Sequence, residues 1–330
     1  MTIQIGVLGT GVMGCELAEA ITEHVAEARV AAAYDAYPPT LDAFCEKLGA
    51  APAASAEDLL ARADIQAVLI ATPNHQHCEQ TVAAAAAGKH VFCEKPMALS
   101  VADCDRMIAA CERAGVKLMV GQSTRLYPLC RRLLDLASPD ELGEPLLGIS
   151  NYFFSGFKER KSGSWHIERA LSGGIFFHMA IHQIDFFHAL FGPSRRVQYA
   201  GGRYGSQVRD FDDAGTILVE FQSGKTGVIS ASSLSSVHST DMRFIFSRGF
   251  ARLESPWSHL EYGPDADHMT RLSVEDAPGP GAVEMELGSF VRWVLDDEPP
   301  VLTAAEGRAA VAVAEAADRA KATEKAVVLG

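Results

Sequence analysis

The chain lacks the features that mark membrane proteins and nucleic-acid-binding proteins. No apolar run is long enough to cross a bilayer, and the first residues enter a predicted strand without a charged leader or a cleavage site. Basic residues are the minority, with 29 Lys and Arg against 42 Asp and Glu, so the formal net charge is −13. Nucleic acids and anionic membranes attract basic surfaces, so neither is expected as a partner. We expect a cytoplasmic protein that binds a small molecule.

The cysteines lack the spacing of a metal site and of a disulfide framework. There are 7, an odd number, and all lie in the first 130 residues. Cysteines without such spacing are usually reduced and packed as small apolar side chains, and we expect this here. The set is Cys15, Cys45, Cys78, Cys93, Cys104, Cys111 and Cys130.

Two domains are predicted from the length and the pattern of the chain. With 330 residues, of which 48% are hydrophobic, the chain exceeds the size at which one core usually stops growing. Residues 1–122 alternate short apolar strands with helices, which is typical of a parallel, doubly wound α/β sheet. Residues 123–330 predict an α+β domain with a large, mostly antiparallel open sheet.

The same patterns predict individual elements. In the first domain we expect strands at 30–34, 67–71, 90–93 and 117–120. In the second we expect helices at 126–136, 175–190 and 303–322, strands at 146–154 and 326–329, and a hairpin of strands 214–221 and 225–232. Hydroxyls three residues before carboxylates predict helix starts at Ser55 (with Asp58), Ser100 (with Asp103) and Thr303 (with Glu306).

A glycine-rich turn predicts a dinucleotide site. Gly9, Gly11 and Gly14 lie between a predicted strand at 3–8 and a helix that begins near Val12. In this arrangement the first glycine permits the tight turn, the second lets a pyrophosphate approach the backbone, and the third lets helix and sheet pack closely. We therefore expect cofactor contacts from Gly9, Gly11, Val12, Met13 and Gly14.

Asp35 completes this fingerprint at the end of the second predicted strand. A carboxylate there accepts hydrogen bonds from the adenine ribose and repels a 2′-phosphate. Its neighbours Tyr34 and Ala36 offer no basic group for such a phosphate. The sequence therefore favours NAD over NADP.

Residues that follow the other strands of a parallel sheet are the next candidates, because ligands bind beyond the carboxyl ends of the strands. One strand ends before Thr72-Pro73-Asn74, and the next ends in Glu94-Lys95. A lysine in a dry pocket can have its pKa lowered toward neutrality, so Lys95 is a candidate general acid or base. The alternative is a surface lysine that closes a strand.

A second polar group interrupts an apolar segment. His178, His182 and Asp185 are spaced four and three residues apart, which places them on one face of the predicted helix 175–190. Polar groups on an apolar helix need partners, and this set favours a site. Two alternatives are core histidines and a zinc site, but no clear third metal ligand is present, so no metal is expected.

The loop before this segment is locally basic in an acidic chain. It carries Lys158, Arg160 and Lys161, followed by Trp165. One interpretation is a solvated turn. The other is that one basic side chain, with Trp165, lines the substrate site and recognises a carboxylate or a phosphate.

Several segments together resemble the Gfo/Idh/MocA oxidoreductases, named for glucose-fructose oxidoreductase and inositol dehydrogenase. They are Gly9-x-Gly11-x-x-Gly14, Thr72-Pro73-Asn74-x-x-His77, residues 88–96 ending in Glu94-Lys95-Pro96, Arg125, and Gly173-Gly174 followed by His182-x-x-Asp185. The resemblance implies a Rossmann domain, a C-terminal domain whose sheet forms homodimers or homotetramers, and NAD(P)-dependent chemistry on sugars or cyclitols.

The resemblance also implies roles for particular residues. Lys95 and His182 would be the acid/base pair, with Asp185 nearby in the substrate pocket. Cofactor contacts would further come from Thr72, Pro73, Asn74, His77, Glu94 and Lys95, and substrate contacts from Lys95, Arg125, Trp165, His178, His182 and Asp185.

One position departs from the family pattern. Inositol dehydrogenases of this family carry an aspartate one turn before the histidine, where this chain has His178. The substrate class and the direction of the reaction therefore stay open, and His178 is expected to tune or orient the acid/base pair.

Two other functions are compatible with the sequence. One is an NAD-dependent glycoside hydrolase that oxidises the ring transiently, and the other is a dinucleotide-binding sensor without catalysis.

Overall fold

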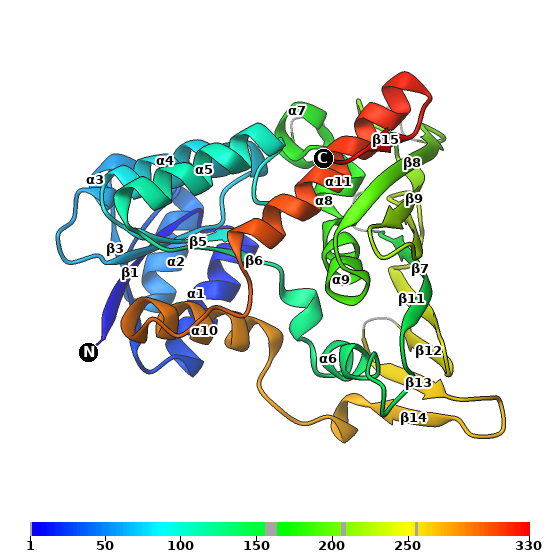
Figure 1. The fold of residues 1–330 in the computed structure, drawn as a ribbon. Helices are drawn as coiled ribbons and strands as arrows, with labels where there is room; N and C mark the ends of the chain where they lie inside the picture. The colour runs from blue at the N-terminus through cyan, green and yellow to red at the C-terminus, as the bar shows by residue number, and fades with distance from the viewer. Residues whose placement is uncertain (1, 156–163, 206–208, 255–256) are drawn as a thin grey trace. The chain divides into compact units, whose positions relative to one another are not determined.

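The computed structural model describes residues 2–155, 164–205, 209–254 and 257–330. It divides into two compact units. The first comprises Met1–Gln122 and Val283–Arg308, and the second comprises Ser123–Ala282 and Ala309–Gly330. Both are drawn in Figure 1, and each is described by itself.

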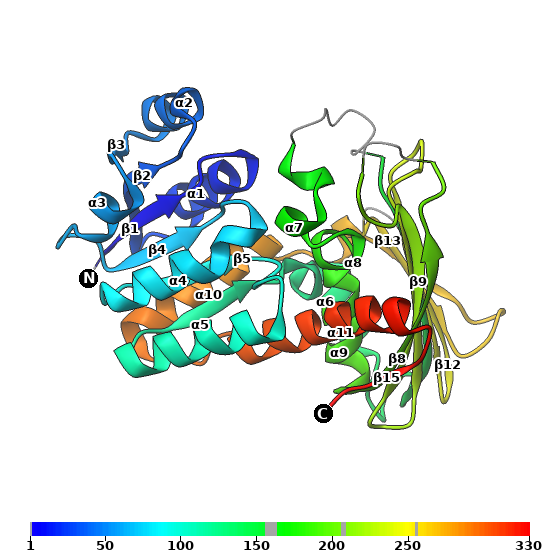
Figure 2. The same ribbon diagram turned by 90° about the horizontal axis from the view of Figure 1, so that it is seen from above.

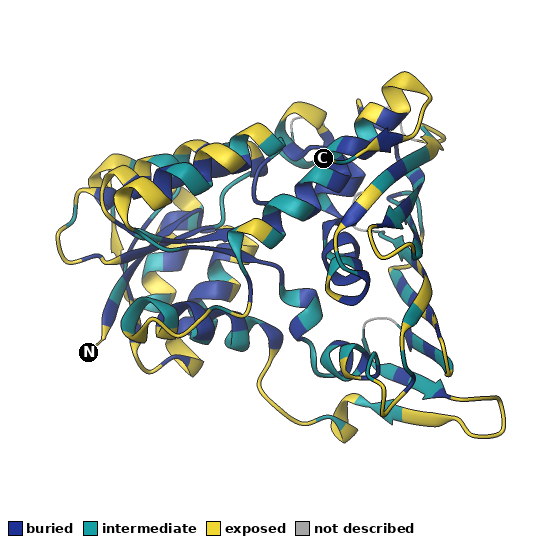
Figure 3. Ribbon diagram, in the orientation of Figure 1, coloured by how far each residue is buried: buried dark blue, intermediate teal, exposed yellow. Residues whose placement is uncertain are grey.

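The first unit is built on a six-stranded parallel sheet with the order β3-β2-β1-β4-β5-β6. Its central strands are buried on both faces because helices cover both sides, with α4 and α5 on one face and α1 and α10 on the other (Figures 1 and 3). This confirms the expected doubly wound sheet. The strands are β1 (Ile3–Leu8), β2 (Ala28–Tyr34), β3 (Ala51–Pro52), β4 (Ala67–Ile70), β5 (His90–Glu94) and β6 (Leu118–Gly121).

Two helices of this unit, α3 and α5, begin at the caps that the sequence predicts. Ser55 Oγ accepts a hydrogen bond from the Asp58 amide at 3.0 Å, and Ser100 Oγ accepts one from the Asp103 amide at 3.1 Å. The helices are α1 (Val12–His24), α2 (Pro38–Leu48), α3 (Ala56–Leu60), α4 (His77–Ala86), α5 (Val101–Ala114) and α10 (Ala282–Asp296), with short 3₁₀ turns such as Asn74–Gln76.

Residues 283–308 pack with the first unit, although the sequence assigns the whole stretch 123–330 to the second domain and predicts no helix at α10. The reason is apolar packing together with ion pairs. Phe290 is fully buried, with its ring centroid 5.8 Å from that of Phe92. Lys117 pairs with Asp297, and Arg308 at the end of the segment pairs with Asp105 of α5. The expected boundary at 122/123 coincides with the first break between the units.

The second unit is built on a nine-stranded sheet with the order β14-β13-β12-β11-β7-β10-β9-β8-β15. The sheet is antiparallel except where β7 pairs with β10, so the expected mostly antiparallel sheet is confirmed. The strands are β7 (Pro145–Phe153), β8 (Ser194–Gly202), β9 (Ala214–Phe221), β10 (Thr226–Ser232), β11 (Ser239–Phe246), β12 (Gly249–Glu254), β13 (His259–Gly263), β14 (Thr270–Ser273) and β15 (Val327–Val328).

The helices of the second unit lie against one face of this sheet, as Figure 2 shows for α8, α9 and α11. The predicted capping box of α11 is present, because Thr303 Oγ1 accepts from the Glu306 amide while Glu306 Oε2 accepts from the Thr303 amide. The helices are α6 (Pro128–Asp135), α7 (Arg169–Ser172), α8 (Ile175–His178), α9 (Ile181–Phe191) and α11 (Ala304–Thr323), with 3₁₀ turns at Ser123–Leu126, Trp165–Ile167 and Val274–Asp276.

The expectation of one helix over 175–190 is wrong. The segment forms two helices, and the chain bends at Met179 and Ala180, where the Ala180 amide donates back to the Ile175 carbonyl at 3.0 Å. His178 ends the first helix and His182 lies in the first turn of the second. The two histidines therefore do not share one continuous helix face.

Among the described residues, no helix is both long enough and apolar enough to cross a bilayer. This finding does not test the expected cytoplasmic location, which stays a prediction.

Candidate active site

The glycine-rich turn after β1 has the close contacts that its sequence predicts. Gly9 has a φ of +91°, and a Cβ there would lie 2.7 Å from the backbone of Ala71 and Thr72. A Cβ on Gly14 would lie 1.9 Å from the carbonyl oxygen of Gly9. The first and third glycines are thus required by the fold itself.

Gly11 differs from the other two glycines because nothing lies within 4 Å of the position that its Cβ would take. It caps α1 without a side-chain hydrogen bond, and Val12, the first residue of the helix, is 84% exposed. The start of α1 is therefore open to solvent at Gly11 and Val12, and an open helix start suits the phosphates of a dinucleotide. The residues present fit the expected cofactor.

Asp35 is held against this turn. Its Oδ2 accepts from the Thr10 amide at 2.7 Å, and its Oδ1 accepts from the Tyr37 amide at 2.8 Å. The carboxylate is thereby fixed between the first turn and the end of β2. A fixed negative charge at this position disfavours an added phosphate.

His77 joins the loops that follow β4 and β5. It is buried, with Nδ1 2.8 Å from the Pro96 carbonyl oxygen and Nε2 2.9 Å from the Thr72 carbonyl oxygen. Burial lowers the pKa of this imidazole. Because both ring nitrogens face backbone oxygens, His77 positions the two loops instead of presenting a nitrogen to a ligand.

The loop after β4 is fixed further by its own polar side chains. Thr72 Oγ1 donates to Gln80 Oε1 at 2.6 Å, and Asn74 is buried at the start of a 3₁₀ turn. Pro73 lies between them. The backbone of Thr72 also passes close to Gly9, so this loop and the glycine-rich turn adjoin at one edge of the sheet.

Lys95 follows β5 at the same edge and is half-buried. Burial lowers the pKa of its ammonium, while the neighbouring Glu94 carboxylate raises it. Glu94 Oε2 accepts a hydrogen bond from the Lys95 amide at 3.1 Å. A lysine whose pKa is lowered gives up its proton more readily, so Lys95 can act as a general base and, once protonated, as a general acid.

Glu94 and Glu286 form a pair of buried acids, of which the sequence analysis singled out only Glu94. Glu94 is 6% exposed, and burial raises its pKa to about 7. Glu286 of α10 is 1% exposed, and burial together with the charges of Glu94 and Glu16 raises its pKa well above the ordinary value. Glu286 Oε2 has no hydrogen-bond partner.

In the second unit, Arg125 and Asp185 form a two-point ion pair. Arg125 Nε lies 2.9 Å from Asp185 Oδ2, and Nη2 lies 2.6 Å from Oδ1. The Asp185 side chain is 1% exposed and that of Arg125 is 11% exposed. The sequence places both residues in the substrate pocket as separate contacts, whereas in the structure they bind each other and join the turn Ser123–Leu126 to α9.

His182 lines a cavity of about 170 Å³ within the second unit. The cavity lies between the turn at Ser123–Leu126, α9 and the strands β7 and β11. Neither Arg125 nor Asp185 is among its described lining residues. These are Ser123, Thr124, Tyr127, Tyr152, His182, Gln183, His238, Thr240 and Trp257.

Trp165 and His178 belong to a separate aromatic cluster. The Trp165 ring stacks on His166 with centroids 3.8 Å apart, and His178 lies edge-on 5.3 Å from Trp165. Neither residue lines the cavity beside His182 among the residues described there. Lys158, Arg160 and Lys161 of the basic loop lie outside the described residues. Across the described ranges, no three His, Cys, Asp or Glu side chains are grouped to hold a metal ion.

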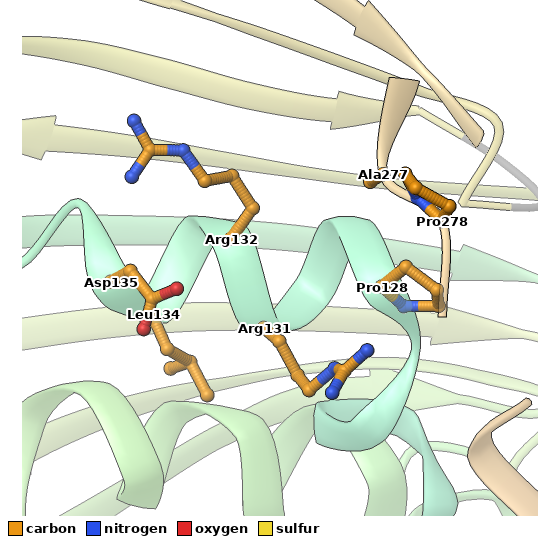
Figure 4. Close-up of a pocket in the computed structure, with 7 residues that line it drawn as sticks. All are labelled: Pro128, Arg131, Arg132, Leu134, Asp135, Ala277 and Pro278. Atoms are coloured by element: carbon orange, nitrogen blue, oxygen red, sulfur yellow. The ribbon is translucent and has the colours of Figure 1, made fainter. Parts of the chain in front are cut away.

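A second cavity, of about 420 Å³, lies between α6 and residues 277–278. Its side chains, including Arg131, Arg132 and Asp135, are drawn in Figure 4. Arg132 points away from Arg131 and pairs with Glu141 at 2.9 Å. This cavity contains none of the residues that the sequence predicts for catalysis.

Sequence reasoning missed the residues that line the cavity with His182. Tyr152, His238 and Trp257 come from strands and loops far apart in the chain, so no local spacing links them. Gln183 directly follows His182 and could have been singled out as a polar residue in an apolar helix.

Comparisons with known proteins agree with this architecture. Residues 3–122 match the model of an oxidoreductase family with an NAD-binding Rossmann fold, and residues 130–252 match the GFO/IDH/MocA C-terminal domain. A myo-inositol 2-dehydrogenase of Thermotoga maritima is 27% identical over 99% of this chain and 98% of its own. A 2,7-anhydro-N-acetylneuraminate hydratase of Mediterraneibacter gnavus is 33% identical over 66% of this chain and 57% of its own.

A solved levoglucosan dehydrogenase in complex with NADH and L-sorbose superimposes with a TM-score of 0.90. It is 20% identical and covers 100% of this chain and 99% of its own, so it supports the fold. The chain spans 62%, 57% and 61% of the length of the first three curated relatives that it matches. With both family domains matched and the glycine-rich turn in place, the chain belongs to the Gfo/Idh/MocA oxidoreductase family, and its first domain is an NAD-binding Rossmann domain.

Proposed function

We propose that the protein is an NAD-dependent dehydrogenase or reductase that interconverts a secondary alcohol and a ketone of a sugar, a sugar derivative or a cyclitol. The observation that carries this proposal is Lys95, a half-buried lysine with a lowered pKa at the sheet edge that also holds the glycine-rich turn. The inositol and levoglucosan dehydrogenases among its relatives and structural neighbours support the substrate class.

In this proposal one group of residues binds the cofactor and another transfers the proton. Gly11, Val12 and Met13 present amides to the phosphates, and Asp35 accepts hydrogen bonds from the adenine ribose. When bound, the nicotinamide supplies the two-electron acceptor or donor. Lys95 takes the hydroxyl proton during oxidation and returns it during reduction.

The second unit supplies the remaining roles in this proposal. His182 shares the proton transfer with Lys95, as the family resemblance implies. His178 and Trp165 orient the substrate from the aromatic cluster. Arg125 and Asp185 act by fixing the first turn of α9, which holds His182.

The direct test is a panel of sugars, sugar acids and cyclitols with NAD, followed by NADH absorbance. Net NADH formation supports the proposal. A glycoside hydrolase of the same family would cleave its substrate and regenerate the cofactor, so no NADH would accumulate. A sensor without catalysis would bind NAD and ligand without turnover of any compound.

We also propose a homodimer or homotetramer through the outer face of the second unit's sheet. Three adjacent strands place apolar side chains side by side there, since Val228 pairs in register with Ile149 and with Leu218. Ile149 is 37% exposed and Ile245 is 44% exposed. Light scattering should give a multiple of the chain mass, and Ile149→Glu should shift it toward the single chain. A monomer in the unmodified protein would contradict the proposal.

A further inference from the structure

We propose that Glu94 and Glu286 form a buried proton store that compensates the charge of the cofactor: the pair gives up a proton when NAD binds and keeps it when NADH binds. The proposal rests on the NAD site of the proposed function, but it requires no turnover. Both carboxyls belong to the first unit.

Helix α10 brings Glu286 to the face of β5 that carries Glu94. Phe92 and Glu94 are two residues apart on β5, so their side chains lie on the same face of the sheet. Glu286 and Phe290 are one turn apart on α10 and share one face of that helix. The rings of Phe92 and Phe290 meet with centroids 5.8 Å apart, and the charge of Glu94 acts on Glu286. The two carboxyls are therefore near neighbours.

The Glu94 carboxyl is fixed at the end of β5. Gly121 of β6 pairs in register with Glu94, and a Cβ there would lie 3.0 Å from the Phe92 ring and 3.2 Å from Glu94 Oε1. The other oxygen, Oε2, accepts a hydrogen bond from the Lys95 amide at 3.1 Å. Glu94 is 6% exposed and Glu286 is 1% exposed. Bulk water therefore does little to stabilise a negative charge on either carboxyl.

The surroundings of the pair keep it protonated near neutral pH. Burial is the largest cause, and it raises the pKa of Glu94 to about 7 and that of Glu286 well above its ordinary value. The negative charge of Glu16 on α1 raises both pKa values further, while the positive charge of Lys95 lowers that of Glu94. The pair therefore still carries protons at a pH where ordinary glutamates carry none.

The charge of the cofactor changes at the same edge of the sheet. In the proposed NAD site Asp35 holds the adenine ribose at the end of β2, and a dinucleotide crosses from there to the strands on the other side of β1. Its nicotinamide end would reach the carboxyl ends of β4 and β5, where Thr72 and Glu94 lie. This ring is positively charged in NAD and neutral in NADH. A positive charge favours the ionised form of a carboxyl, so NAD should drive a proton off the pair.

The proton balance of the proposed reaction is unchanged by the store. Oxidation of the alcohol transfers a hydride to the cofactor and the hydroxyl proton to Lys95, so the net products are the ketone, NADH and one proton. The store takes up as much as one proton once the positive charge is gone, and it releases the same amount when NAD replaces NADH. Glu94 and Glu286 thus change when the proton leaves, and the net yield stays the same.

Binding calorimetry in two buffers of different ionisation enthalpy counts the released protons. NAD and NADH are each titrated into the protein between about pH 6 and about pH 8. Both carry the same phosphates, so their difference isolates the charge of the ring. If that charge lowers the pKa of Glu94 by about one, the ionised fraction at pH 7 rises from half to about nine-tenths, and NAD should release about 0.4 proton more than NADH. Equal release with both cofactors would overturn the inference.

Variants identify the source of the proton. The double variant Glu94→Gln, Glu286→Gln keeps the shape of both side chains and should remove the difference between NAD and NADH. Glu284→Gln, on the same helix, should keep it. Lys95→Met should also keep it, at a somewhat higher pH, because the positive charge that favours ionised Glu94 is gone. Loss of the difference in Lys95→Met, or an undiminished difference in the double variant, would assign the proton to Lys95 and refute the store.

The titrations separate this inference from the proposed function. If no compound of the panel is oxidised, the proposed function fails, and the comparison of NAD with NADH still decides whether the store exists. If turnover occurs and the two cofactors release equal numbers of protons, the proposed function stands without the store. Glu94→Gln alone should already lower the difference near pH 7, which keeps the test available if the double variant does not fold.

Discussion

At the scale of single residues, the three positions of the first turn require glycine for different reasons. Gly14 has no room for a Cβ because the Gly9 carbonyl would lie 1.9 Å away. Gly11 has open space at the same atom and a φ of −66°, which any residue adopts. Gly9 and Gly14 are required by the fold, whereas Gly11 is explained by a ligand that approaches the backbone.

This difference predicts opposite outcomes for two alanine variants. Gly11→Ala should keep its thermal midpoint but bind NAD at least about tenfold more weakly, because the added methyl meets the pyrophosphate. Gly14→Ala should lose several kcal/mol of stability by overpacking, roughly the upper end of such effects. Calorimetry of unfolding and NAD titration measure both. A Gly11→Ala protein with unchanged NAD affinity would contradict the site.

Asp35 predicts the choice between NAD and NADP. NAD should bind at least about tenfold more tightly, which corresponds to roughly 1.4 kcal/mol. Asp35→Asn should narrow that preference by removing the charge, and its remaining oxygen can still accept from the Thr10 amide. Fluorescence titration with both cofactors checks this. Preferred NADP binding by the unmodified protein would refute the assignment.

At the scale of elements, the Arg125–Asp185 pair joins the turn Ser123–Leu126 to α9. Asp185→Asn leaves a mostly buried guanidinium without its counter-charge and should cost about 3–5 kcal/mol in urea unfolding. Replacing both residues by apolar ones should recover part of that loss. If Asp185 instead contacts substrate directly, as the sequence suggested, turnover would fall while stability stayed near that of the unmodified protein.

Helix starts that depend on residues close together in the sequence could be predicted from it. The packing of the elements against one another could not. The caps at Ser55, Ser100 and Thr303 depend on neighbours three residues away, so the pattern reveals them. The bend at Ala180 has no proline or glycine to mark it, because the surrounding tertiary structure sets it. The contact between the rings of Tyr152 and His238 depends on the pairing of β7 with β11, which no local spacing in the sequence reveals.

At the scale of the whole molecule, residues 283–308 return to the first unit and bring Glu286 toward Glu94. Nothing in the sequence of α10 shows which sheet it will cover. The consequence is electrostatic, because two buried carboxyls with raised pKa values bind protons more tightly in the folded than in the unfolded state.

This pair predicts the pH dependence of stability. A raised folded pKa means that the contribution is fully present below the unfolded pKa, near 4.5, and is lost as pH rises through the folded value. For Glu94 the stabilising contribution is lost between that pH and about pH 7, and for Glu286, whose pKa is also raised well above its ordinary value, it is lost in the same direction. Glu286→Gln should therefore match the unmodified protein near about pH 5 and melt a few degrees higher near about pH 8.

Glu284→Gln is the matched control, because Glu284 lies on the same helix and is half-buried. The difference in thermal midpoint between this variant and the unmodified protein should not change with pH. A thermal midpoint of Glu286→Gln that stays below that of the unmodified protein at every pH would show that the carboxyl makes a stabilising contact instead.

The central claim is that Lys95 moves the substrate proton, and Lys95→Met tests it most directly. With the best substrate of the panel, NADH formation by this variant should fall by about 10²–10⁴-fold, the usual range for loss of a general acid or base, while NAD affinity hardly changes. Lys47→Met, on an exposed ion pair of α2, should keep full activity. In the unmodified protein, kcat/KM should rise with pH to a midpoint below about 10.4, the ordinary lysine value. Retention of most of the turnover by Lys95→Met would contradict the account.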